Sequence, residues 1–421
     1  MSRRLLFLAL FVCVATAAHA DRRRAVQHPA PSVLPAGTPT FSNEVVRIFQ
    51  QSCQTCHHDG DIAPFSLVDY ADARAHAALI KLMTQTKQMP PWKATDGCGD
   101  FSDARVLPQS AIDTIARWVD AGAPEGDRAQ LPPPLDFSSG WVKGEPDLVL
   151  KNDVAFTPPA EGDTYRCFTI PAKTTSTKYV AASDVHPGDR ETVHHVLTFI
   201  DTTGVSQQLD DKDPGPGYTC FGGPGFDTTG TLGGWAPGMR PLEVPENTGF
   251  ELPANSRVVI QVHYHPHHGT PSADQTELGL YFTKSKPKQL MRVLPLINQT
   301  FTIPPHTNAY PVTADFPLRV PFPMHIWFVA PHMHLLGRTM HVQMQPLGAD
   351  ASCLIRIDDW AFNWQTVYRY KEGLAVPANT RLWATATYDN PTDRSVSWGE
   401  ATTDEMCIAF LGVTFDGETL Q

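Results

Sequence analysis

Hydrophobic residues recur at helical spacing in the first part of the chain and at strand-like spacing after about residue 137. Two sets follow the helical period, namely Val45, Ile48, Phe49 and Cys53, and then Ile112, Ile115, Ala116 and Val119. Ser110 is suited to cap the second helix and Gly122 to end it. With a further helix expected from Asp69 to Thr86, the pattern predicts a small all-α domain over residues 41–128.

After this helical part, short runs rich in β-branched and aromatic residues alternate with turn residues. The runs are HHVLTFI, SRVVIQVHYH, ELGLYFT, HIWFVAP, TMHVQMQ, RLWATATYDN and EMCIAFLGVTF. Such spacing is typical of antiparallel β-sandwiches. The stretch DRAQLPPPLDF indicates a linker over 129–139, and KSKPKQLMRVLP is suited to join two β modules. We therefore expect two jelly-roll-like sandwich domains, at 140–288 and 289–421.

Length and composition agree with a multidomain globular protein. A chain of 421 residues is too long for one ordinary core, and 38 prolines favour turns and β structure over long helices. The formal net charge of −11 would repel nucleic acids and anionic membranes, so it argues against a general role in binding either.

The N-terminus has the three parts of a secretory signal. Arg3 and Arg4 precede an apolar run from Leu5 to Val14, and Ala18-His19-Ala20 fits a cleavage site. We expect a signal peptide over 1–20, a flexible lead-in over 21–40, and a periplasmic or secreted protein that does not span the membrane. Export would place the seven remaining cysteines in an oxidising compartment.

One short motif predicts a haem. Cys53-Gln54-Thr55-Cys56-His57 has the C-x-x-C-H pattern of covalent haem c, in which two thiols bind the porphyrin and the histidine binds the iron. Met89, in TKQMPPWKA, is the preferred second axial ligand, and Met83 is its rival inside the expected helix. The segment resembles small bacterial cytochrome c modules with an MPPW loop and a final W-x-x-x-G-A-P, here Trp118 to Pro124. The alternative is a redox C-x-x-C or half of a zinc site.

Three histidine clusters follow the haem motif and predict metal binding. They are His194 and His195 in VHHVLTF, the run from His263 in VHYHPHH, and His332 and His334 in PHMHLLG. In H-x-H on a strand both imidazoles point to one face, whereas adjacent histidines converge only at a twist or bulge. Imidazole suits copper, zinc and iron, and the thioether of Met406, in TTDEMC, would favour copper.

The order of these motifs resembles the copper type II, ascorbate-dependent monooxygenases, over about residues 140–421. The resemblance implies two copper ions held by β-sandwich modules that face each other across a solvent-filled cleft. It implies that an electron-transfer copper is bound by His194, His195 and His263. An oxygen-activating copper would be bound by His332, His334 and Met406, which are then the catalytic residues.

Several positions stay open or depart from the family. His265 is a candidate auxiliary ligand or supporting group, and His267 and His268 are expected in a solvated turn. Where the peptide-amidating branch holds a substrate carboxylate with arginine and tyrosine, this chain has Ala330 and Phe410, so a small, apolar substrate fits better. We expect Cys167 to pair with Cys220 and Cys353 with Cys407, although the sequence does not fix the pairing.

These features predict an exported monooxygenase that inserts one oxygen atom from O2 into a C–H bond. Electrons would arrive through the fused haem from a redox protein or an ascorbate-like reductant, because fusion makes their delivery intramolecular. The rival hypothesis is a non-catalytic electron-transfer or copper-binding protein. A secreted zinc hydrolase is disfavoured, since no glutamate stands beside the H-x-H and methionine rarely binds zinc.

Overall fold

The computed structural model describes residues 35–421, except residues 60, 62, 103, 138–139, 222, 266–270, 317–318, 419 and 421. The predicted signal peptide, most of the lead-in, His267 and His268 lie outside the described residues. Residues 39–421 form one compact unit. None of the described helices is long and apolar enough to cross a membrane.

The N-terminal part of this unit contains short helices. They are η1 (Phe41–Val45), α1 (Val46–Ser52), α2 (Tyr70–Ala75), α3 (Ala77–Gln85), α4 (Gln109–Asp120) and η2 (Arg128–Gln130). On α4, Ile112, Ile115 and Trp118 are buried, as their spacing of three residues requires. The prediction that Ser110 caps this helix was wrong, because α4 begins at Gln109, with Pro108 in the capping position. The helix expected over 69–86 is two helices separated at His76.

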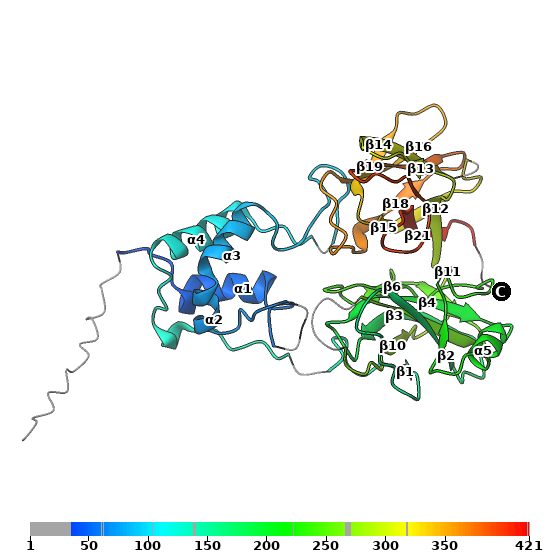
Figure 1. The fold of residues 1–421 in the computed structure, drawn as a ribbon, viewed down its shortest axis with the longest axis horizontal. Helices are drawn as coiled ribbons and strands as arrows, with labels where there is room; N and C mark the ends of the chain where they lie inside the picture. The colour runs from blue at the N-terminus through cyan, green and yellow to red at the C-terminus, as the bar shows by residue number, and fades with distance from the viewer. Residues whose placement is uncertain are drawn as a thin grey trace, which may run out of the picture. The chain divides into compact units, whose positions relative to one another are not determined.

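The first β region consists of β1–β11 and one helix (Figure 1). Its elements are β1 (Leu148–Lys151), β2 (Thr164–Pro171), β3 (Lys178–His186), β4 (Val193–Asp201), α5 (Val205–Asp210), β5 (Tyr218–Thr219), β6 (Gly234–Trp235), β7 (Leu242–Glu243), β8 (Thr248–Leu252), β9 (Arg257–Tyr264), β10 (Glu277–Phe282) and β11 (Gln289–Leu290). One sheet has the order β1-β10-β3-β8-β11, with β7 paired to β3, and the other has the order β5-β2-β9-β4-β6. Buried residues of both sheets share one core, to which β3, β4, β9 and β10 contribute.

The second β region consists of β12–β21, drawn from yellow-green to red in Figure 1. Its strands are β12 (Arg292–Asn298), β13 (Thr302–Ile303), β14 (Thr307–Asp315), β15 (Met324–His332), β16 (Gly337–Gln345), β17 (Ser352–Ile357), β18 (Tyr368–Val376), β19 (Arg381–Asn390), β20 (Val396–Ser397) and β21 (Cys407–Phe415). They form sheets β12-β21-β15-β18, β14-β19-β16-β17 and β13-β20. The alternating burial along β19 follows directly from its apolar-polar alternation.

The predicted fold class, an all-α cytochrome c-like domain followed by two β-sandwich domains, is wrong. The described residues are mostly β structure in small sheets of two to six strands, with five short α-helices of 6 to 12 residues. They show no separate all-α cytochrome c domain. Physically, the stretch 92–102 is not helical. It consists of turns and irregular backbone, and two isolated β-bridges attach it to the second β region.

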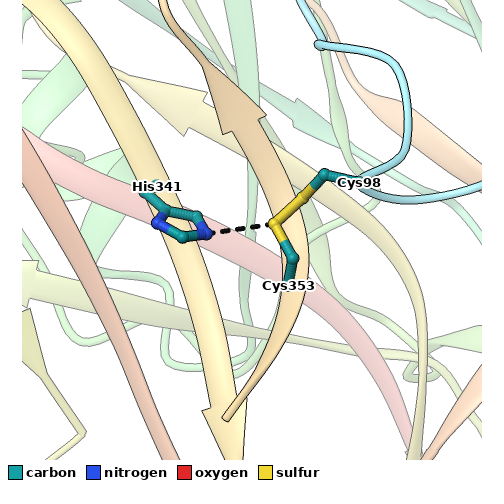
Figure 2. Close-up of side chains that lie close together, drawn as sticks. All are labelled: Cys98, His341 and Cys353. Atoms are coloured by element: carbon teal, nitrogen blue, oxygen red, sulfur yellow. Dashed lines mark hydrogen bonds between the residues drawn. A yellow bond between two sulfur atoms is a disulfide. The ribbon is translucent and has the colours of Figure 1, made fainter.

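Residues 92–102, which we call the strap, attach to β17 and β18. Ala94 bridges to Ile357 and Phe101 to Tyr370, and both Ala94 and Phe101 are buried in the core of the second β region. The strap also carries Cys98, which forms a disulfide with Cys353 of β17 (Figure 2). The helical part is thus covalently tied to the second β region.

The observed disulfides correct one expected pairing and confirm the other. Cys167 pairs with Cys220, as expected. Cys353 pairs with Cys98 instead of Cys407, which stays a free thiol at the start of β21 with no exposed surface. The error arose because nothing in the sequence indicates that the strap reaches β17.

Candidate metal centre

His194, His195 and His263 come together where β4 begins and β9 ends. The two strands pair antiparallel, with His195 directly opposite His263. The register shifts between Val193 and His195, so His194 is an extra residue in β4. This is the bulge that two adjacent histidines need in order to point at one place. One nitrogen of each ring lies within 4.8 Å of the others, and we call this set the three-histidine centre.

The nitrogens of the three-histidine centre have the separation of ligands around one ion. His195 Nδ1 lies 3.3 Å from His194 Nδ1 and 3.2 Å from His263 Nδ1. Two nitrogens bound to one ion at about 2.0 Å in tetrahedral geometry would be about 3.3 Å apart. A ring nitrogen either donates or accepts one hydrogen bond, so His195 Nδ1 cannot make good hydrogen bonds to both neighbours. A cation shared by the three lone pairs fits both contacts.

Asp163 holds one ring of this centre in the binding tautomer. Its Oδ1 lies 3.0 Å from His263 Nε2, so the N–H of His263 donates there and Nδ1 keeps its lone pair. His265 Nδ1 also lies against Oδ1 of Asp163. Burial would raise the pKa of Asp163, but hydrogen bonds from His263 and His265 hold it well below its usual range. The structure thus places His265 beside the supporting carboxylate.

The surroundings keep the imidazoles of His195 and His263 neutral and oriented. Burial lowers the pKa of His195 well below its usual value, and the neighbouring His263 and His194 lower it further. Burial also lowers the pKa of His263. Tyr165 stacks on the His263 ring, with centroids 4.2 Å apart and planes 7° apart. Neutral imidazole is the form that binds metals.

The second set, His332, His334 and Met406, lies where β15 ends and β21 begins. His332 pairs with Ile408, and continuing this antiparallel register places Met406 opposite His334. Met333, between the two histidines, has no exposed surface and points into the core. If the alternation continues past His332, it turns both imidazoles to the other face, on which the extended register also places Met406. We call this set the His-His-Met centre.

Both rings of the His-His-Met centre make a hydrogen bond through Nδ1, which would leave Nε2 to bind a metal. His332 Nδ1 donates to Oε1 of Gln365, and His334 Nδ1 donates to the carbonyl of Asp404 at 3.1 Å. The rings stand nearly perpendicular, with centroids 5.2 Å apart. Burial, and then His334, lower the pKa of His332 to about 3, and burial lowers the pKa of His334 to about 4. Both imidazoles are thus neutral donors at pH 7.

Glu405 is a supporting residue that the sequence did not single out. Its side chain has no exposed surface and accepts backbone N–H bonds from His334, Leu336 and Met406 at 2.6 to 3.1 Å. Burial raises the pKa of Glu405 to about 7, against the lowering effect of these amides. The carboxylate fixes the backbone on both sides of the centre. The sequence pattern around Glu405 does not show that this residue is buried, so it could not be told from an exposed acidic residue.

The loop between β17 and β18 contacts both centres. Phe362 stacks on His194, with centroids 4.9 Å apart and planes 18° apart, and meets His334 edge-on at 6.0 Å. Trp360 Nε1 donates to the carbonyl of His334, and Gln365 accepts from His332. Sequence reasoning also missed this loop, because its residues have no metal-binding pattern.

The C-x-x-C-H residues follow α1. Cys53 and Cys56 are free thiols, and burial, then the neighbouring Cys56, raises the pKa of Cys53 to about 12. His57 Nδ1 donates to the carbonyl of Phe65 at 3.0 Å, which leaves Nε2 available. Met89 follows α3, and its amide donates to the carbonyl of Met83. This contact does not distinguish the two methionines, so the choice of Met89 stays a prediction.

Comparison with known proteins supports the copper assignment for part of the chain. Residues 289–413 match the model of the copper type II ascorbate-dependent monooxygenase, C-terminal domain. The chain is 25% identical over 277 residues to DBH-like monooxygenase protein 1 of Homo sapiens, covering 60% of this chain and 44% of that protein. The same protein of Mus musculus is 25% identical over 278 residues, with the same coverage. The chain thus spans less than half the length of these curated relatives.

Two solved structures are similar only at low TM-score. The major capsid protein P2 of bacteriophage PM2 has a TM-score of 0.28 at 10% identity, over 65% of this chain and 99% of that one. PNGase F, a glycosylasparaginase from Flavobacterium meningosepticum, has a TM-score of 0.25 at 12% identity, over 65% of this chain and 97% of that one. Neither likeness carries an argument about function.

Proposed function

We propose that this chain is a copper-dependent monooxygenase that hydroxylates a C–H bond of a small, apolar substrate with O2. The observation that carries the proposal is the presence of two sets of candidate copper ligands in one compact unit. One of the two sets lies within residues 289–413, which match the monooxygenase model. Copper, when bound, supplies one-electron chemistry and the activation of O2. The residues supply binding, orientation and the exclusion of competing ligands.

The three-histidine centre is suited to the electron-transfer role. Asp163 fixes the tautomer of His263, and Tyr165 fixes the plane of its ring. A carboxylate behind a ligating imidazole also raises the basicity of that imidazole. Rigid, basic nitrogen donors keep the ligand set unchanged while an electron enters or leaves.

The His-His-Met centre is suited to the reaction with O2. Two imidazoles and a thioether favour cuprous copper, and three protein donors leave a coordination position open. Gln365 and the Asp404 carbonyl aim the two Nε2 lone pairs, while Glu405 fixes the backbone beside His334 and Met406. Because backbone amides occupy the Glu405 oxygens, this carboxylate is poorly placed as the general base of a zinc hydrolase.

Two side chains beside the His-His-Met centre, those of Ala330 and Phe410, indicate the class of substrate. Ala330 and Phe410 are cross-strand partners on β15 and β21, two residues from His332 and Ile408, which also pair. Side chains at that spacing share one face of a sheet, so Ala330 and Phe410 present an apolar surface beside the candidate ligands. A buried carboxylate would find neither a cation nor a hydroxyl from these two residues.

We also propose that Cys53 and Cys56 bind haem c and that His57 is its axial ligand. The free thiols and the His57 ring, held through Nδ1, have the donor chemistry for this group. Bound haem would supply one-electron transfer from an external reductant. The test is the alkaline pyridine spectrum of denatured protein, where covalent haem c gives a characteristic band and loss of both cysteines should remove it.

The two disulfides agree with an extracellular or secreted protein.

The monooxygenase proposal is tested with copper-loaded protein, a reductant and isotopically labelled O2. Small apolar compounds are screened by mass spectrometry for products that contain one labelled oxygen atom. The control is the His332→Ala/His334→Ala protein, which should keep the three-histidine centre and form no product. Copper that is reduced and reoxidised without any labelled product would instead favour the non-catalytic electron-transfer protein.

A further inference from the structure

A third group of donor atoms lies outside both candidate centres, where the strap meets β16 and β17. Its members are Cys98, His341 and Cys353, and one ligand atom of each lies within 4.8 Å of the others. The two sulfurs form a disulfide, and His341 Nε2 lies 3.0 Å from Sγ of Cys353. Figure 2 shows the imidazole directed edge-on at the sulfur pair.

A register shift brings His341 and Cys353 to the same face of the sheet. Along β16 and β17, His341 pairs with Arg356 and Val342 with Ile355, but Gln343 pairs with Cys353. Without the shift, Cys353 would face Met344, whose side chain points to the opposite face from His341. With the shift, Cys353 is the diagonal neighbour of His341, close enough for side chains to touch.

The strap keeps Cys98 in place by contacts other than the disulfide. The amide of Thr95 donates to the carbonyl of Arg356, and the amide of Ser102 donates to the carbonyl of Arg369. Phe101 is only 6% exposed in the core of the second β region. These contacts flank Cys98 on both sides, so its sulfur would stay near Cys353 and His341 after the S–S bond is broken.

We propose that Cys98, Cys353 and His341 form a binding site for a thiophilic cation of the zinc class when the disulfide is reduced. An external dithiol breaks the S–S bond by exchange, becoming a disulfide itself and leaving two thiols. Zn²⁺ then displaces the two thiol protons and binds two thiolates and the imidazole. Two sulfurs and one nitrogen are a typical partial ligand set for zinc, with one further position open to water.

The state of His341 supports this proposal. Burial, and then the nearby Arg356, lower the pKa of His341, so its ring is neutral at pH 7. The Cys167–Cys220 disulfide offers the matched contrast within the same chain. There the polar neighbour of the sulfur is the amide of Gln261, 3.6 Å from Cys220 Sγ, which is a poor ligand for zinc.

The test uses the full chain with Cys53→Ser and Cys56→Ser, so that the C-x-x-C-H thiols cannot bind metal. The protein is reduced anaerobically with a dithiol, freed of it, and titrated with Co²⁺ as a spectroscopic substitute for Zn²⁺. We expect one equivalent of cobalt with a thiolate-to-cobalt charge-transfer band in the reduced protein and none in the oxidised protein. The all-nitrogen and thioether centres cannot give this band.

Two further variants assign the band. Cys98→Ser/Cys353→Ser should abolish it, and His341→Asn should weaken cobalt binding at least about tenfold, a loss expected even for a supporting contact. Circular dichroism and thermal melting check that each variant is folded. A band that survives loss of Cys98 and Cys353, equal affinity in a folded His341→Asn protein, or a reduced protein without the band would each overturn the proposal.

Discussion

The two candidate copper centres differ in the groups that hydrogen-bond to the ring nitrogens facing away from the metal. In the three-histidine centre, Nδ1 atoms converge and a carboxylate, Asp163, holds the far side of His263. In the His-His-Met centre, a neutral amide and a backbone carbonyl hold Nδ1, and Nε2 would bind the metal. An anionic partner makes an imidazole more basic and favours cupric copper, whereas a thioether favours cuprous copper. With copper bound, the residues of the first centre would thus favour the cupric state, and those of the second the cuprous state.

Replacing Met406 with leucine should have the largest effect. Leucine conserves volume, so the core keeps its packing while the thioether is lost. We expect product formation to fall by at least about 100-fold, because the preference for cuprous copper is removed. The three-histidine centre should still bind one copper, counted by metal analysis. Full hydroxylation by the leucine variant would place the reaction with O2 elsewhere.

Asp163→Asn should weaken the first centre alone. The asparagine keeps the shape but removes the charge behind His263, and such changes cost about 10- to 100-fold in metal affinity. Copper titration monitored by electron paramagnetic resonance should show the loss at the three-histidine centre. An equal loss at the His-His-Met centre would show that the two centres are not independent.

Gln365→Leu should weaken the second centre, by about tenfold or less. The acceptor is neutral, so its loss costs less than loss of the Asp163 charge. Gln365→Glu is the matched control, since it restores an acceptor for His332 Nδ1. Cuprous affinity, measured by competition with a chelator, should fall in the leucine variant and recover in the glutamate variant. No recovery would mean that Gln365 acts by packing.

Phe362→Leu should have the smallest effect and should affect both centres. The ring stacks on His194 and touches His334, and an aromatic contact contributes about 0.5–1.5 kcal/mol beyond its buried area. We expect the free energy of unfolding to fall by about 1 kcal/mol, measured by urea denaturation. Copper affinities should change by less than about threefold, because no ligand or hydrogen-bond partner is lost. A large change confined to one centre would contradict a shared role.

Periodicity alone determined where the chain changes from helices to strands. It predicted the apolar face of α4 and the alternation of β19, because these patterns are local. It failed for the strap, which attaches to the second β region through the bridges of Ala94 and Phe101 and the disulfide of Cys98, all to residues more than 250 positions later. A segment of that kind has no local period, so it was assigned to a helical domain that does not exist.

The same division holds for the candidate centres. From strand geometry, the sequence predicted that His332 and His334 share a face and that adjacent His194 and His195 need a bulge. The register shift in β4 confirms the bulge. Only the tertiary structure decided which ring nitrogen is available. The supporting side chains lie far along the chain from their partners. Asp163 is 100 residues from His263, Gln365 is 33 residues from His332, and Glu405 is 71 residues from the amide of His334. A hydrogen bond fixes a tautomer through a distance of about 3 Å, and chain folding alone creates that distance.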